Sequence, residues 1–114
     1  MELPNASSVE VSREKIVGYL LNPGHPDGAG KAAFFRAAGF CVERWEELAE
    51  ALTNLAKHAS VLRSMESAHG SKYIIDGQVN APSGQVIHVR SVWIVDRGRQ
   101  VPRLVTAYPV RQGM

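Results

Sequence analysis

The sequence contains a single cysteine, Cys41, among its 114 residues. One cysteine excludes an internal disulfide framework and any zinc site built from several cysteines. The sequence also has no apolar run approaching the roughly 18 residues of a membrane span, and no basic-then-apolar leader. We therefore expect a cytoplasmic protein with no membrane partner.

Net charge is also small, at +2, which by itself does not indicate a nucleic-acid partner. Its distribution is uneven, because residues 1–70 carry seven Lys or Arg against nine Asp or Glu, whereas residues 71–114 carry six against two. A basic C-terminal part is compatible with a phosphate-bearing ligand such as RNA. Ordinary solvation by scattered arginines explains the same numbers equally well.

Apolar residues at helical spacing predict three helices in the first half of the chain, over residues 13–21, 29–38 and 42–58. A dense cluster of proline and glycine at 22–28 separates the first two, and Gly39 is the expected terminator of the second. The length of 114 residues predicts one domain, with the helical part at about 12–58 and the sheet part at about 60–110.

Runs rich in β-branched and aromatic residues predict strands in the last third of the chain. The runs are residues 72–79, 86–95 and 103–110, and a further strand is expected around residues 61–65. Helices followed by strands predict an α+β fold with the helices packed on one face of an antiparallel sheet of three to four strands.

Alternation along each strand assigns its residues to two faces. The expected core side carries the apolar residues Tyr73, Ile75, Ile87, Val89, Trp93, Val95, Val105 and Ala107. The opposite side then carries Lys72, Asp76, His88, Arg90, Leu104, Thr106 and Tyr108. For the apolar residues of the strands at 72–79 and 86–95 to lie on the same face, the numbers of paired residues must have an even sum, such as 76 with 88. That parity predicts an odd-length loop or a bulge, with Gly84 at positive φ.

The sequence has neither the pattern of a nucleotide phosphate loop nor that of a histidine metal site. The segment from Gly28 to Lys31 lacks the first glycine and the hydroxyl residue of a nucleotide phosphate loop. The four histidines show no short paired spacing on one helix, so we expect neither a metal site nor a cofactor.

The predicted polar face has the residue types that metal-independent RNA cleavage needs. That reaction requires a group to accept the 2′-hydroxyl proton, a group to protonate the leaving oxygen, and cations to stabilise the phosphorane. His88 and Arg90, two residues apart on one strand, would lie beside Lys72, Thr106 and Tyr108 on the neighbouring strands. The alternative is that these residues form only the solvated side of a one-sided sheet.

Four sequence segments resemble those of a small bacterial family catalogued as a domain of unknown function. They are Leu-Pro-Asn-Ala at 3–6, Tyr-Leu-Leu-Asn-Pro-Gly-His-Pro at 19–26, Lys-Ala-Ala-Phe-Phe at 31–35 and Pro-Arg-Leu-Val-Thr-Ala-Tyr-Pro at 102–109. The closing strand and the helices-then-sheet order are also similar to the ribonuclease superfamily of barnase, EndoU, colicin-type nucleases and RelE-like toxins. Many members of that superfamily act as toxins held by an antitoxin partner.

This resemblance implies roles for individual residues. It makes His88 or His69 the general acid or base, Lys72 and Arg90 the phosphate clamps, and Thr106 with Tyr108 the orienting hydroxyls. His25 and Lys31 belong to the signature segments, where His25 either reaches a cleft or only braces its turn. Two function classes remain: a ribonuclease, as the toxin of a toxin–antitoxin pair, and a non-enzymatic module that binds a protein through the sheet face or edge.

Overall fold

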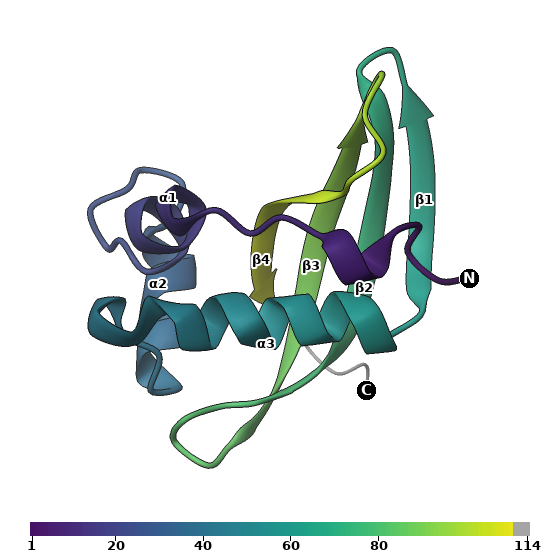
Figure 1. Cartoon of the computed structure of the whole chain (residues 1–114). Coiled ribbons are helices and arrows are strands. Elements are labelled where there is room, and N and C mark those ends of the chain that lie inside the picture. The colour runs from purple at the N-terminus through teal and green to yellow at the C-terminus, as the bar shows by residue number, and fades with distance from the viewer. Residues whose placement is uncertain (111–114) are drawn as a thin grey trace.

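The computed structural model describes residues 1–110. Helical segments in the N-terminal half precede four strands, which form one antiparallel sheet (Figure 1). The helices lie on one side of this sheet, and α3 crosses its strands (Figure 1). The predicted α+β class is therefore confirmed. Arg111, which contributed to the basic charge count, lies outside the described residues.

The second and third predicted helices are present with small changes at their ends. Helix α2 covers Ala29–Ala37, and Gly39 follows it at φ +100°, as a helix terminator requires. The start of the third predicted helix is a 3₁₀ turn, η3 (Val42–Arg44), which leads into α3 (Trp45–His58). A further 3₁₀ turn, η1 (Ala6–Ser8), lies near the N-terminus.

The first predicted helix is shorter and less regular than its sequence pattern indicated. Ser12 caps α1 (Arg13–Lys15), and a π-helical turn, η2 (Ile16–Leu20), replaces the rest of the helix. The backbone N–H of Leu21 donates to the carbonyl of Ile16, five residues back, at 2.8 Å. Although π turns are rare in proteins, those that occur are often found at functional sites. Tyr19 lies within η2.

The four strands pair in the order in which they occur in the chain. They are β1 (Val61–Ser67), β2 (Gly70–Asn80), β3 (Val86–Asp96) and β4 (Arg103–Pro109). All three pairings are antiparallel, so short connections suffice between consecutive strands. The strand expected around residues 61–65 is thus real, and it forms one edge of the sheet. No helix within residues 1–110 is long and apolar enough to cross a membrane.

The register between β2 and β3 has the predicted parity but not the predicted pair. Asp76 lies opposite Arg90, and His88 lies opposite Gln78, so the paired numbers have an even sum that is larger by two than expected. The connecting loop spans residues 81–85 and has Gly84 at φ +92°. The odd loop length and the positive φ of Gly84 are both confirmed.

The core lies between the helices and the expected apolar side of the sheet. Trp93 is fully buried, and its indole N–H donates to the Ser91 hydroxyl at 2.9 Å. That hydroxyl donates in turn to the carbonyl of Ile75 at 3.1 Å, which satisfies a buried polar side chain at a core position. Ile87 and Val89 are buried as predicted, whereas Val95 is only half-buried.

The predicted facing of β4 was wrong for two residues. Val92 pairs with Thr106 but Trp93 pairs with Leu104, so β4 contains a bulge at Val105. A bulge inserts one extra residue and reverses the facing of the residues beyond it. Leu104 is therefore buried and Val105 only half-buried, the reverse of the expectation from strict alternation.

Candidate active site

We call the sheet face away from the helices the open face, which carries the even-numbered residues of β2 and β3. At its centre the guanidinium of Arg90 donates to both carboxylate oxygens of Asp76, with Nε–Oδ1 at 2.7 Å and Nη2–Oδ2 at 2.8 Å. Hydrogen bonding to this carboxylate raises the pKa of Arg90 above its ordinary value. The pair uses two of the five guanidinium donors and balances its charge, which weakens Arg90 as a phosphate clamp.

Two further predicted residues lie next to this pair. Tyr108 on β4 is directly opposite Arg90, and His88 is two residues from Arg90 along β3. The carbonyl of His88 accepts the backbone N–H of Val110 at 3.1 Å, which holds β3 against the end of β4. The structure therefore brings His88, Arg90 and Tyr108 together on neighbouring positions.

Lys72 and His69 lie away from this centre. Lys72 is opposite Ile94 and four residues from Asp76 along β2, which is about 13 Å of extended strand. His69 is exposed in the turn between β1 and β2, where its carbonyl accepts the N–H of Arg97 at 2.9 Å. The six predicted residues thus do not form one compact site.

Thr106 points toward a different group of side chains, between the N-terminal helices and β4. Its hydroxyl oxygen lies 2.9 Å from the phenolic oxygen of Tyr19, within hydrogen-bonding distance. Thr106 pairs with Val92 in regular register and lies next to the extra residue Val105. Two residues that are 87 positions apart in the sequence are therefore joined by a hydrogen bond.

Two lysines and a histidine surround Tyr19. The Nζ atoms of Lys15 and Lys31 lie 5.2 Å and 5.3 Å from the centroid of the Tyr19 ring. The imidazole of His25 meets the same ring edge-on, with centroids 4.9 Å apart. We call Lys15, Tyr19, His25, Lys31 and Thr106 the Tyr19 cluster.

The surroundings of Tyr19 lower the pKa of its phenol. Burial raises the pKa of its phenol, but hydrogen bonds from Thr106 and Lys31 and the positive charges of Lys31 and Lys15 lower it more. The net result is a pKa below the ordinary tyrosine value. A lowered pKa lets the phenol ionise at lower pH than an ordinary tyrosine, which is the direction that a general base requires.

Local hydrogen bonds fix His25 and Lys31. The backbone N–H of Asp27 donates to Nδ1 of His25 at 3.0 Å, so in the neutral imidazole the proton resides on Nε2. Nζ of Lys31 donates to the Asp27 carbonyl at 2.9 Å. His25 therefore braces its turn, which was one of the two roles considered for it from the sequence. Its Nε2–H remains available as a donor.

A glycine lets this loop approach Tyr19 closely. Gly28 is buried at the start of α2, and a Cβ added there would lie 2.6 Å from the Tyr19 carbonyl oxygen and 3.0 Å from its ring carbon Cδ1. Any larger residue would force the loop away from η2. Gly28 therefore lets the loop that carries His25 and Asp27 lie against Tyr19.

Two adjoining pockets, of ≈ 570 Å³ and ≈ 540 Å³, share Tyr19, Asp27 and Thr106 in their walls. The first also contains Lys15, His25 and Glu14, and the second contains Lys31 and Tyr108. Each pocket has room for a nucleotide-sized group beside hydroxyl and ammonium groups. Within residues 1–110, no group of three or more His, Cys, Asp or Glu side chains is arranged to hold a metal ion.

Sequence reasoning found part of this cluster. Thr106 and Tyr108 were predicted as orienting hydroxyls, and His25 and Lys31 were noted only as parts of signature segments. Tyr19 and Lys15 were missed, since helical spacing assigns them to an ordinary amphipathic helix. The available signal was the Tyr19–Pro26 segment itself, in which a tyrosine precedes a histidine by six positions.

The family model described as "Domain of unknown function (DUF6883)" matches residues 2–111. The chain belongs to this family. No curated protein matches the sequence closely enough to indicate a relationship. The DUF6883 chain is similar to a chain of the solved structure titled "Contact-dependent growth inhibition toxin - immunity protein complex from Klebsiella pneumoniae 342", with a TM-score of 0.74 and 18% identity over 94% of this chain and 97% of that chain. At this identity the likeness shows a shared fold.

Proposed function

We propose that this DUF6883 chain is a metal-independent ribonuclease that cleaves RNA by attack of the 2′-hydroxyl, and that the Tyr19 cluster is its active site. The observation that supports this proposal is the hydrogen-bonded Tyr19–Thr106 pair with two lysine ammonium groups beside the tyrosine ring. It combines a titratable oxygen with positive charge at the wall of two pockets. RNA cleavage needs both in the same place.

In the proposed reaction, the Tyr19 phenolate accepts the proton of the 2′-hydroxyl. The 2′-oxygen attacks the adjacent phosphorus, and the ammonium groups of Lys15 and Lys31 stabilise the phosphorane. The bond from phosphorus to the 5′-oxygen then breaks, and the leaving oxygen takes a proton from Lys31. The products are a 2′,3′-cyclic phosphate and a free 5′-hydroxyl, and solvent restores both protonation states.

The remaining residues hold the reacting groups. Thr106 orients the Tyr19 phenol through their 2.9 Å contact. His25 donates from Nε2 to a phosphate oxygen, because the Asp27 N–H occupies its Nδ1. Tyr108 lies in the same pocket as Lys31 and supplies a second hydroxyl or an aromatic surface for a base.

We further propose that the chain is the toxin of a toxin–antitoxin pair and is held by a protein partner. The support is the shared fold with a chain from a structure titled as a toxin–immunity protein complex. A toxin that cleaves the RNA of its own cell would need a bound partner to block it. Inducible expression should arrest bacterial growth, and Tyr19→Phe should remove the arrest at equal protein level.

The direct test uses purified protein, excess EDTA and a fluorogenic RNA oligonucleotide, beside the same sequence with 2′-deoxyribose throughout. We expect cleavage of the RNA alone, with 2′,3′-cyclic phosphate ends identified by mass spectrometry. Tyr19→Phe should lower the rate by about 10²- to 10⁴-fold, the usual contribution of a general base.

The matched control is Tyr73→Phe, which removes the same hydroxyl from a tyrosine on the helix side of β2. This control should cleave at the parent rate. Equal rates for Tyr19→Phe and Tyr73→Phe would contradict the assignment of the active site. Loss of cleavage in EDTA, or equal cleavage of the deoxy substrate, would contradict the proposed chemistry.

A further inference from the structure

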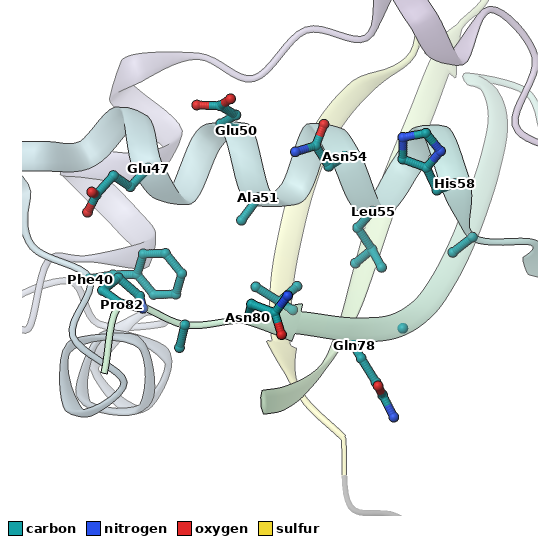
Figure 2. A pocket seen from close by; sticks show the side chains of 14 residues that line it. Phe40, Glu47, Glu50, Ala51, Asn54, Leu55, His58, Gln78, Asn80 and Pro82 are labelled. Atoms are coloured by element: carbon teal, nitrogen blue, oxygen red, sulfur yellow. The ribbon is translucent and has the colours of Figure 1, made fainter. Parts of the chain in front are cut away.

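A larger groove lies between α3 and the end of β2, on a different part of the molecule from the Tyr19 cluster. Its volume is ≈ 660 Å³. Figure 2 shows Ala51 and Leu55 directed from α3 toward β2, and Glu47 directed toward Phe40 and Pro82 at one end. On the strand side the lining alternates between polar Gln78 and Asn80 and apolar Val79 and Ala81, whereas the helix side carries Glu47 and Glu50.

A glycine in β2 lets α3 lie close over the strand. A Cβ added to Gly77 would collide with Cδ1 of Leu55. Gly77 therefore leaves room for the end of the Leu55 side chain against the strand. Gly77, Leu55 and Ala59 all line the groove, so this packing between α3 and β2 forms part of its wall.

The strand at the base of this groove has an unpaired edge. At the two ends of the β2–β3 hairpin, the N–H of Ala81 donates to Gln85 and the N–H of Arg97 donates to His69. Odd-numbered residues of β2 therefore direct their backbone groups toward β3. The even-numbered Asp76, Gln78 and Asn80 direct theirs to the other edge of the strand.

Within the part of the chain that the structure describes, no strand covers that edge beyond Ile75. The first residue of β1, Val61, pairs with Ile75, and β1 then continues away from the groove. The N-terminus does not fill the gap, because the carbonyl of Met1 reaches only the N–H of Val61. An uncovered edge of this kind accepts an additional strand from another chain.

Charge selects the occupant of the groove. The 14 residues that line it include Glu47 and Glu50 and no lysine or arginine. Arg44 offsets part of the charge of Glu47, with Nε–Oε1 at 3.3 Å, yet both side chains stay largely exposed. The groove therefore complements a strand with basic side chains.

We propose that this groove binds an extended, basic segment of a partner protein, which adds as a strand to the edge at Asp76, Gln78 and Asn80. About five residues fill this length of edge, at about 3.3 Å per residue. Alternate Lys or Arg side chains lay their aliphatic stems along Ala51 and Leu55 and place their charges at Glu47 and Glu50. The site is separate from the proposed ribonuclease site and does not depend on it.

The probe is a fluorescein-labelled Thr-Lys-Thr-Lys-Thr-Lys-Thr peptide, beside its Thr-Glu counterpart. Fluorescence anisotropy should show binding of the lysine peptide alone, and N-methylation of alternate residues should abolish it. Amide hydrogen exchange should slow at Gln78 and Asn80 but not at Val79, whose N–H already bonds β3. The double variant Glu47→Gln/Glu50→Gln should weaken binding roughly tenfold, as expected for two exposed ion pairs.

The matched control is Glu43→Gln/Glu46→Gln, which removes two charges from the same part of the chain outside the groove. It should bind within twofold of the parent. Equal weakening by both double variants would mean general charge attraction and would overturn the proposal. So would binding without protection of Gln78, or protection that rises with protein concentration in the absence of peptide, which would indicate a second copy of the chain.

Discussion

The open face and the Tyr19 cluster contain similar residue types but differ in how their charges are balanced. On the open face, Asp76 binds both Nε and Nη2 of Arg90, so the cation is already neutralised. In the Tyr19 cluster, Glu14 and Asp27 line the same pocket, yet within residues 1–110 no salt bridge involves Lys15 or Lys31. The ammonium groups of Lys15 and Lys31 help to lower the pKa of Tyr19, whereas on the open face Asp76 offsets the charge of Arg90.

Tyr108 connects the two regions at the edge strand. It lies opposite Arg90 on one side and lines a pocket with Tyr19 and Lys31 on the other. A substrate bound to the Tyr19 cluster can therefore extend toward the open face. Pairs of variants that make the same chemical change in each region test which of the two regions is the active site.

The largest difference is expected between Lys31→Met and Lys72→Met. Loss of the Lys31 ammonium removes transition-state stabilisation beside Tyr19 and should lower kcat/KM on a fluorogenic RNA about 10²- to 10³-fold. Lys72, opposite Ile94 and distant from the cluster, should change it less than threefold by the salt-dependent attraction of RNA alone. A larger loss of kcat/KM for Lys72→Met than for Lys31→Met would indicate that the active site lies on the open face.

The two histidines give the next largest contrast. His25→Ala removes a donor to phosphate, a charge-assisted bond worth about 1.5–3 kcal/mol, so kcat should fall roughly 10- to 100-fold. His88→Ala should stay within twofold, provided circular dichroism shows that both proteins are folded. If His88→Ala instead lowers kcat roughly 10- to 100-fold and His25→Ala stays within twofold, the catalytic role predicted for His88 from the sequence is supported.

Thr106→Val tests the hydroxyl contact with Tyr19. The hydrogen bond from Thr106 helps to lower the pKa of Tyr19, so its loss should raise that pKa. Fewer molecules then carry the phenolate at pH 7, and the rate should fall about tenfold for each unit of pKa increase. Because the base ionises at higher pH, activity should recover as pH rises, and absorbance at 295 nm should show the same shift. A uniform loss at every pH would exclude Tyr19 as the base.

Much of the fold was predictable because local signals agreed with the final packing. Alternation identified the core side of β3, and parity with an odd loop gave the β2–β3 register to within two residues. The errors came from irregular backbone, for which composition gives no direct signal. The bulge at Val105 reversed Leu104, and the π turn η2 replaced a regular helix around Tyr19.

The candidate site was harder to predict for the same reason. Thr106 and Tyr19 are 87 positions apart, and irregular backbone lies at both, with the bulge at Val105 beside Thr106 and the π turn containing Tyr19. Sequence alternation places Thr106 with Arg90, on the face that turned out to hold the Asp76–Arg90 ion pair. The register keeps that placement, because Thr106 pairs with Val92 and Tyr108 with Arg90. Alternation could not show that Tyr19 and Lys31, from the helical half, line the same pocket as Thr106 and Tyr108.

The smallest effects are expected at the Asp76–Arg90 pair, and they concern stability. Both side chains keep about a third of their exposure, at 29% and 32%, so solvent screens the ion pair. Arg90→Met or Asp76→Asn should each lower the free energy of unfolding by about 1 kcal/mol, measured by urea denaturation. The double variant should lose less than the sum, because either single change already breaks the pair. Cleavage should stay within threefold in all of them, since this cation is neutralised by its own strand neighbour; a loss comparable to that of Lys31→Met would make Arg90 part of the active site.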